Sequence, residues 1–185
     1  MNKLLAHILA LPRVHSILMS WAVLTPYTHL DGYMYRWWLV PNADPEAGPG
    51  CGPVDWRHRP LAWLLQRRGI MVRIHLILQP DPGQYPHDHP WDARTYIMQG
   101  SYVEERVEQK GFNQTHVTHT LRSTGETAEL RHGEFHRISW VQPEGALTLF
   151  VAGEKQGDWG FLVKGRKIPA WAYAYGVGKL NGEGS

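Results

Sequence analysis

The chain has 185 residues and a formal net charge of +2. This length suits a single domain spanning residues 1–185, and the small net charge gives no long-range field that would favour a nucleic acid. Nine tryptophans and 43% hydrophobic residues are typical of a packed fold and exclude disorder. The lone cysteine, Cys51, cannot form an internal disulfide, which favours a reducing compartment, so we expect a cytoplasmic protein.

The first thirty residues are apolar but interrupted. The interruptions are His7, Pro12, Arg13 and His15, so no apolar run reaches the ~18 residues of a membrane span. Hydrophobic residues recur near helical spacing at Leu4, Ile8, Leu11, Leu18 and Ala22. We expect a helical extension over residues 1–30, broken near Pro12 and packed on the outside of the fold. Attachment to a membrane surface is the lesser alternative.

The rest of the chain reads mainly as strands. Residues 33–40 are aromatic and apolar, residues 42–53 are rich in Pro and Gly and predict a loop, and residues 59–68 predict a short helix that ends at Gly69. From residue 70 onward short strands are expected at 70–78, 95–99, 102–107, 112–121, 127–130, 135–141, 146–152 and 159–163. Regularly spaced short strands predict an all-β barrel or sandwich with its core at residues 70–165.

Three histidines stand out by their spacing. His87 and His89 are one residue apart, so on a strand both side chains would face the same side. His136, about fifty residues later, could complete three imidazoles around one divalent metal with open coordination positions. The alternative is structural: the first two would cap a strand end before Pro90, and His136 would be a buried, hydrogen-bonded histidine.

The histidines and the glycines around them resemble the two motifs of the cupin superfamily. Six residues fit the spacing of those motifs: His87, His89, Gly100, Gly125, Gly133 and His136. The wider string His-Asp-His-Pro-Trp-Asp is similar to a group of uncharacterised cupins from bacteria and phages. The resemblance implies a cupin-type double-stranded β-helix, which is a jelly-roll barrel, and a bound metal; it implies no particular substrate.

The chain departs from the cupin pattern at the usual fourth ligand. The resemblance places this glutamate at Ala93, which has no donor atom. The remaining ligand set of three histidines is similar to that of cysteine-dioxygenase-like cupins. Asp92 is the candidate for an additional carboxylate ligand, provided that Pro90 bends the strand enough to reverse its parity. Asp88 faces away on a regular strand and could instead hold an imidazole by a hydrogen bond.

Strand parity predicts which residues line the pocket beside the metal. Side chains that share a face with the histidines or with position 93 are Tyr85, Thr95, Ile97, Gln99, Ile138 and Trp140. Three further candidates are Arg73, His75 and Trp91, of which Arg73 could meet an anionic substrate. A half-apolar wall with a few polar groups is typical of a small-molecule site.

These features predict a metal-dependent cupin enzyme that acts on a small molecule, with an Fe(II) oxygenase as the expected reaction class. Iron is the expected metal, and Ni, Zn and Mn are the alternatives. The competing hypothesis is a non-catalytic module that binds metal or a small ligand in the same barrel. No inward histidine with a partnered acid is evident, which argues against isomerase chemistry. A homodimer remains open, and nothing in the sequence indicates a nucleic-acid or membrane partner.

Overall fold

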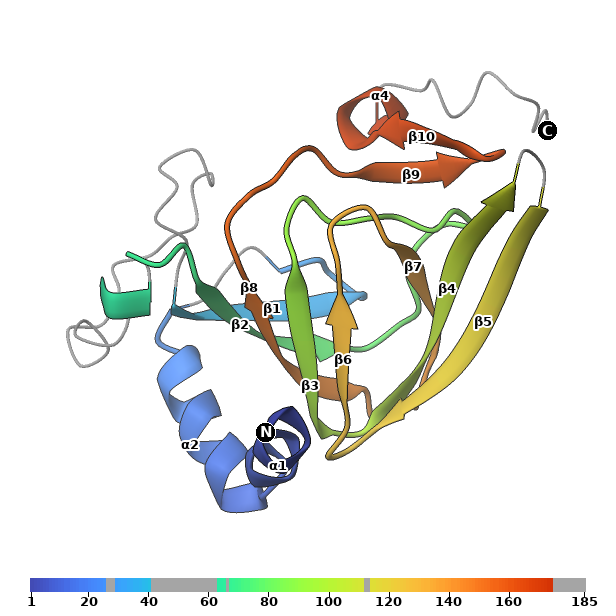
Figure 1. Cartoon of the computed structure of the whole chain (residues 1–185). Helices are drawn as coiled ribbons and strands as arrows, with labels where there is room; N and C mark the ends of the chain where they lie inside the picture. Colours follow the sequence, from blue (N-terminus) through green and yellow to red (C-terminus); the bar gives the residue numbers. More distant parts are fainter. Residues whose placement is uncertain (26–28, 41–62, 66, 112–113, 175–185) are drawn as a thin grey trace.

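The computed structural model describes residues 1–25, 29–40, 63–65, 67–111 and 114–174 (Figure 1). Its strands are β1 (Met34–Val40), β2 (Met71–Ile77), β3 (Ala93–Gln99), β4 (Ser101–Gly111), β5 (Gln114–Ser123), β6 (Thr127–Leu130), β7 (Phe135–Val141), β8 (Ala146–Ala152), β9 (Gly160–Val163) and β10 (Arg166–Pro169). Its helices are α1 (Asn2–Leu9), α2 (Pro12–Ala22) and α4 (Ala170–Ala174). The predicted loop at 42–53 and half of the predicted helix at 59–68 lie outside the described residues, as does Cys51.

Two antiparallel sheets form the body of the molecule. One has the strand order β1-β2-β8-β3-β6 and the other the order β5-β4-β7, with the hairpin β9-β10 at one end (Figure 1). Paired strands far apart in the sequence, such as β2 with β8 and β4 with β7, close the structure. This all-β arrangement of antiparallel sheets confirms the predicted fold class. The strand β10 and the helix α4 were not predicted.

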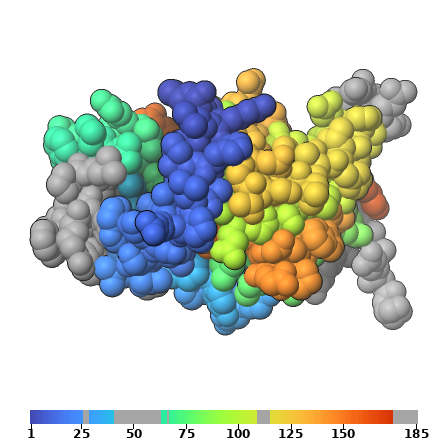
Figure 2. Space-filling model, turned by 90° about the horizontal axis from the view of Figure 1, so that it is seen from below, coloured from blue at the N-terminus to red at the C-terminus, as the bar shows by residue number. Residues whose placement is uncertain are grey.

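The N-terminal helices pack on the outer face of the five-stranded sheet, as expected. Ala6 and Leu9 of α1 and Ala22 of α2 are buried in a core cluster with Tyr96 and Met98 of β3. Figure 2 shows both helices lying across the face of the molecule seen from below. Pro12 is the first residue of α2, where its missing N–H costs no helical hydrogen bond, and the two helices meet at an angle of 78°. No single helix among the described residues has the length and hydropathy to cross a membrane; these two pass such a test only as a bent pair.

Strand β8 shows why the sheet has two different faces. It is apolar along most of its length and almost entirely buried, because helices cover one side and the barrel interior the other. Its residues Leu147 and Leu149 join the cluster beneath the helices, whereas Thr148 and Phe150 line an interior cavity. The interior of the barrel is therefore built from alternate residues of β2, β3 and β8.

Candidate metal centre

The first two histidines lie on an extended segment, residues 86–92, which we call the histidine segment. It is not part of a regular strand, because His87 makes isolated bridges to His136 of β7 and Phe161 of β9. The His87 amide donates to the His136 carbonyl at 2.8 Å, and the His136 amide donates back at 2.9 Å. This backbone pairing keeps the segment extended, so His87 and His89 face the same side, as the spacing predicted.

The structure brings the three histidines together into one group, the histidine cluster. One ring nitrogen from each residue lies within 4.8 Å of the others, and this is the one such group of metal-binding side chains among the described residues. The ring centroids are 4.9–5.1 Å apart, and the Nε2 atoms of His89 and His136 are 2.9 Å apart. Three imidazole nitrogens that converge on one point form a donor set for a divalent metal.

Burial keeps two imidazoles of the cluster, those of His87 and His89, neutral. Loss of solvent lowers the pKa of His87 from 6.5 to about 4, with a further contribution from His136, although Asp81 and Asp88 oppose the shift. Burial lowers the pKa of His89 well below 6.5, assisted by the neighbouring His136 and His87. Because a metal binds only the unprotonated ring nitrogen, these side chains are in the ligating form at neutral pH.

A buried carboxylate orients the third histidine. Glu104 of β4 is 2% exposed, and its Oε1 lies 3.1 Å from His136 Nδ1. Arg122 and Arg106 also contact this carboxylate, at 2.8 and 3.2 Å. Burial raises the pKa of Glu104, but the hydrogen bond and charge of His136 and the charge of Arg106 outweigh it and lower the pKa to about 2. An ionised Glu104 accepts the Nδ1 proton of His136 and leaves its Nε2 available to the cluster.

A second carboxylate lies beside His87. Asp81 Oδ2 is 3.6 Å from His87 Nδ1 and accepts the amide proton of Ile138 at 2.9 Å, and Asp81 Oδ1 accepts the hydroxyl proton of Tyr33. The expectation that no inward histidine has an acidic partner is therefore wrong. Glu104 is 32 positions from His136, whereas Asp81 is close to His87 in the chain. Both carboxylates contact histidines of the cluster, where a carboxylate fixes the ring orientation of a metal-binding imidazole.

The two aspartates of the histidine segment do not join the cluster. Asp88 is fully buried and accepts hydrogen bonds from the Gly160 amide and from Lys167 Nζ, so it holds the β9-β10 hairpin and no imidazole. Asp92 was the candidate fourth ligand. Its oxygens instead accept from the His132 amide at 2.8 Å and from Gln156 Nε2 at 2.9 Å, on the surface. Ala93 next to it is buried, so the strand parity at Asp92 is not reversed.

Both motif halves of the cupin resemblance thus meet between two antiparallel sheets. The two sheets enclose a shared interior and so form a barrel. Its histidine cluster forms part of the wall of a cavity of about 740 Å³. This volume accommodates a small organic molecule.

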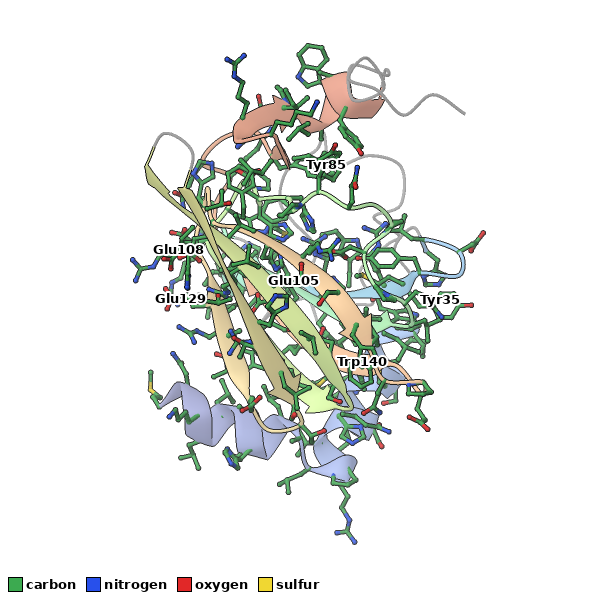
Figure 3. The ribbon with its side chains drawn as sticks, turned by 90° about the vertical axis from the view of Figure 1, so that its right-hand side faces the viewer. Tyr35, Tyr85, Glu105, Glu108, Glu129 and Trp140 are labelled. Atoms are coloured by element: carbon green, nitrogen blue, oxygen red, sulfur yellow. The ribbon has the colours of Figure 1, made fainter. Side chains whose placement is uncertain are left out.

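The cavity contains most, but not all, of the residues that strand parity predicted. Six of them line it: Arg73, His75, Tyr85, Trp91, Thr95 and Ile138. Three do not, namely Ile97, Gln99 and Trp140. Ile97 points inward but is packed in a core cluster beneath the cavity. Gln99 and Trp140 are exposed, and Trp140 lies at the end of β7 far from Tyr85 (Figure 3).

Two β-bulges explain the errors at Gln99 and Trp140. The pairing of β3 with β8 shifts between Ile97 and Gln99, and the pairing of β7 with β4 shifts across Ser139. Each bulge inserts one extra residue into a strand and so reverses the side that the following residue faces. Simple alternation therefore fails beyond Ile97 and Ile138.

Sequence reasoning missed the residues that support the cluster. Glu104 lies two positions after Tyr102, which is buried and lines the cavity, so alternation from this aromatic residue is a signal that could have found it. Asp81 lies in the irregular segment between β2 and β3, where no strand periodicity applies, so the sequence pattern carries no signal for its contact with His87.

No protein-family model and no curated protein matches the chain. Among solved structures it aligns with oxalate decarboxylase of Bacillus subtilis at 18% identity and a TM-score of 0.45. It also aligns with vicilin from Corylus avellana (hazelnut) at 11% and 0.47, and with the capsular polysaccharide assembling protein CapF of Staphylococcus aureus at 15% and 0.48. The alignments cover 72%, 76% and 77% of this chain but 29%, 34% and 32% of the other chains, so it spans about a third of their length. A likeness at this level carries no information about activity.

Proposed function

We propose that this chain is a metal-dependent enzyme acting on a small molecule, with Fe(II)-dependent oxygenation as the reaction class. The observation that carries the proposal is the 2.9 Å separation of two Nε2 atoms within the histidine cluster, at the wall of a cavity. Two nitrogens that each lie about 2.1 Å from one metal, at right angles, are about 3.0 Å apart. That spacing would allow His89 and His136 to hold one divalent metal together, and with His87 as the third ligand the metal would keep positions open to a substrate.

The donor set of three histidines favours a metal site that can bind O₂ over a structural metal site with no open coordination position. Three neutral imidazoles leave the full 2+ charge on the ion, which favours an anionic substrate and O₂ together at the open positions. When bound, iron would supply the redox chemistry that joins O₂ to an organic molecule. Glu104 and Asp81 would hold two of the imidazoles in place. Ni, Zn and Mn are the alternative metals, because each of them binds imidazole alone or imidazole together with oxygen ligands.

Elemental analysis followed by O₂ consumption tests the proposal. We expect the purified chain to hold one divalent metal and, after anaerobic loading with Fe(II), to consume O₂ in the presence of a small organic acid. The His87→Ala and His136→Ala variants should lose the metal. The matched control is His116→Ala, which removes an exposed histidine of β5 and should leave the metal content unchanged. A full equivalent of metal in both cluster variants would place the metal elsewhere and reject the proposal.

A non-catalytic binding module is the second candidate function. The cavity supports it, because a volume of about 740 Å³ can hold a ligand whether or not a reaction follows. For this candidate the loaded protein would bind both metal and an organic acid but would consume no O₂.

A further inference from the structure

Polar side chains cross the five-stranded sheet inside the barrel, on strands that carry none of the cluster histidines. His75 of β2 pairs across the sheet with Thr148 of β8 on one side and with Arg36 of β1 on the other. In the next inward row Arg73 of β2 pairs with Phe150 of β8. All five side chains line the same cavity as the histidine cluster. The cavity therefore has a polar wall on the five-stranded sheet, formed by Arg36, Arg73, His75 and Thr148.

Two atoms of the polar wall are buried without a partner. Among the residues that the structure describes, neither His75 Nε2 nor Thr148 Oγ1 has a hydrogen-bond partner. Thr148 is 1% exposed, and burial followed by the charges of Arg73 and Arg36 lowers the pKa of His75 well below 6.5. Buried polar atoms in folded proteins are nearly always hydrogen-bonded. These two are thus poised to bind a polar group of a molecule in the cavity.

The same wall carries a buried positive charge. Arg73 is 7% exposed, and its guanidinium carbon lies 5.1, 5.2 and 5.3 Å from the ring centroids of Trp38, Trp91 and Phe150. Three aromatic faces stabilise the cation and fix its orientation. A fixed guanidinium presents its N–H groups in a planar fork that matches a carboxylate.

The buried cation lies close to the histidine cluster. Trp91, which contacts Arg73 on one side, stacks on the ring of His89 at 6.2 Å. Phe150 lies between the same two residues, at 5.3 Å from Arg73 and 6.0 Å from His89. One aromatic ring thus separates the cation from the cluster, so one small molecule can reach both.

We propose that Arg73, His75 and Thr148 form a subsite for the carboxylate of a small organic acid, whose body occupies the aromatic cavity beside the histidine cluster. The cation would bind the carboxylate through its planar fork, and the His75 ring and the Thr148 hydroxyl would donate to it. The inference rests on the proposed function, since it names the substrate class of the same cavity. The planar fork matches a phosphate as well as a carboxylate, but only an organic acid also has a body that fills the cavity among the aromatic side chains.

Calorimetric titration of the full-length, chelator-treated chain tests the subsite without any metal. The probes are benzoate and benzamide, which share one shape and differ in charge, and inorganic phosphate. We expect benzoate to bind at least about tenfold more tightly than benzamide, because hydrogen bonds to a charged group are stronger than hydrogen bonds between neutral groups. Equal binding of the two aromatic probes, no binding of benzoate, or tighter binding of phosphate would each overturn the proposal.

Variants of Arg73 and Thr148 test whether the preference for benzoate over benzamide comes from the polar wall. Arg73→Gln should abolish the preference for benzoate, and Arg73→Lys should retain part of it. Thr148→Val keeps the shape of the side chain and should weaken benzoate binding several-fold. It serves as the second test if circular dichroism shows that Arg73→Gln does not fold. The matched control is Arg94→Gln, which removes an arginine of β3 paired with Glu129. A preference that survives both Arg73→Gln and Thr148→Val overturns the subsite.

Different experimental outcomes reject the proposed metal site and the proposed carboxylate subsite. His87→Ala should lose the metal yet keep the preference for benzoate. Metal binding and O₂ consumption without any preference for benzoate would reject the subsite alone. A preference for benzoate in a chain that binds no metal would reject the proposed function and leave the subsite.

Discussion

At the scale of single residues, Glu104 connects the histidine cluster to the charges of the three-stranded sheet. Its carboxylate contacts His136, Arg106 and Arg122 in a place that solvent hardly reaches. Two cations and a histidine stabilise one buried anion, so its ionised form persists far below neutral pH. A fixed negative charge behind a ligating imidazole makes that imidazole a better metal ligand.

Glu104→Gln should therefore weaken metal binding without removing a ligand. The amide preserves the size of the side chain but loses the charge that holds the Nδ1 proton of His136, and we expect metal affinity to fall about tenfold or more. Competition with a chelator of known affinity measures the change. Glu105→Gln is the control, because Glu105 is on the same strand but pairs with Arg137 at the surface (Figure 3). If the two variants lose affinity alike, Glu104 has no special part in holding the site.

At the scale of elements, the histidine segment depends on the β9-β10 hairpin. The Leu162 amide donates to the Pro86 carbonyl, and the Asp88 amide donates to the Gly160 carbonyl. The buried Asp88 side chain adds a hydrogen bond to the Gly160 amide and an ion pair with Lys167. The hairpin thus supports the two histidines from behind, although it contains none of the candidate ligands.

Asp88→Asn should destabilise the fold and loosen the site together. The substitution removes the charge that Lys167 faces and disturbs a buried hydrogen bond, so we expect a loss of about 2 kcal/mol in the free energy of unfolding. Urea titration gives this value, and chelator competition gives the metal affinity. Asp158→Asn is the control, because Asp158 is exposed and pairs only with Lys155 among the ion pairs of the described residues. Equal stability of the two variants would mean that the buried aspartate does not hold the hairpin.

The turn between β3 and β4 requires a glycine at position 100. Gly100 has φ +83°, and a Cβ there would lie 2.3 Å from the Gly145 carbonyl oxygen. Gly100→Ala therefore combines a strained backbone with a clash against another turn. Gly32→Ala isolates the strain, because Gly32 has φ +73° and open space around it. We expect about 1–2 kcal/mol of destabilisation at Gly32 and a clearly larger loss at Gly100, both measured by thermal or urea unfolding.

At the scale of the whole molecule, burying neutral histidines makes stability depend on pH. The folded chain binds a proton at His87 only near pH 4, whereas the unfolded chain does so near pH 6.5. Below pH 6.5 the unfolded state therefore takes up protons that the folded state excludes. The free energy of unfolding consequently falls as the pH drops through this window, and it is unaffected by this residue above it.

The metal-free protein should lose on the order of 2–3 kcal/mol of stability between pH 7 and pH 4.5 through His87 alone. Urea unfolding of wild type and His87→Gln at several pH values isolates this contribution, since the variant should show a shallower pH dependence. His116→Gln, at an exposed position, should follow the wild type. Identical pH profiles for wild type and His87→Gln would show that burial of this imidazole does not govern acid stability.

The sequence by itself determined the strands and the place of the histidines. Turn glycines and apolar runs are local signals, so β6, β7 and β8 begin and end at the residues that the pattern predicted. The spacing of His87 and His89, together with the glycines before His136, places all three on inward-facing positions. Alternation along an extended backbone is a property of the backbone itself and needs no partner strand.

Only the tertiary structure decided which neighbours complete the site. The bulges at Met98 and Ser139 turn Gln99 and Trp140 outward, and a bulge exists only where one strand pairs with another. Asp81 and Glu104 reach the cluster from other strands and turns, and Asp92 is held away from it by a loop residue forty positions on. The contacts of Glu104 and Asp92 join residues 32 and 40 positions apart, where no period in the sequence relates them. Asp81 is close to His87 in the chain but lies in an irregular segment, where no strand period applies. The fold was therefore readable from local patterns, whereas the surroundings of the histidines followed from which strands lie side by side.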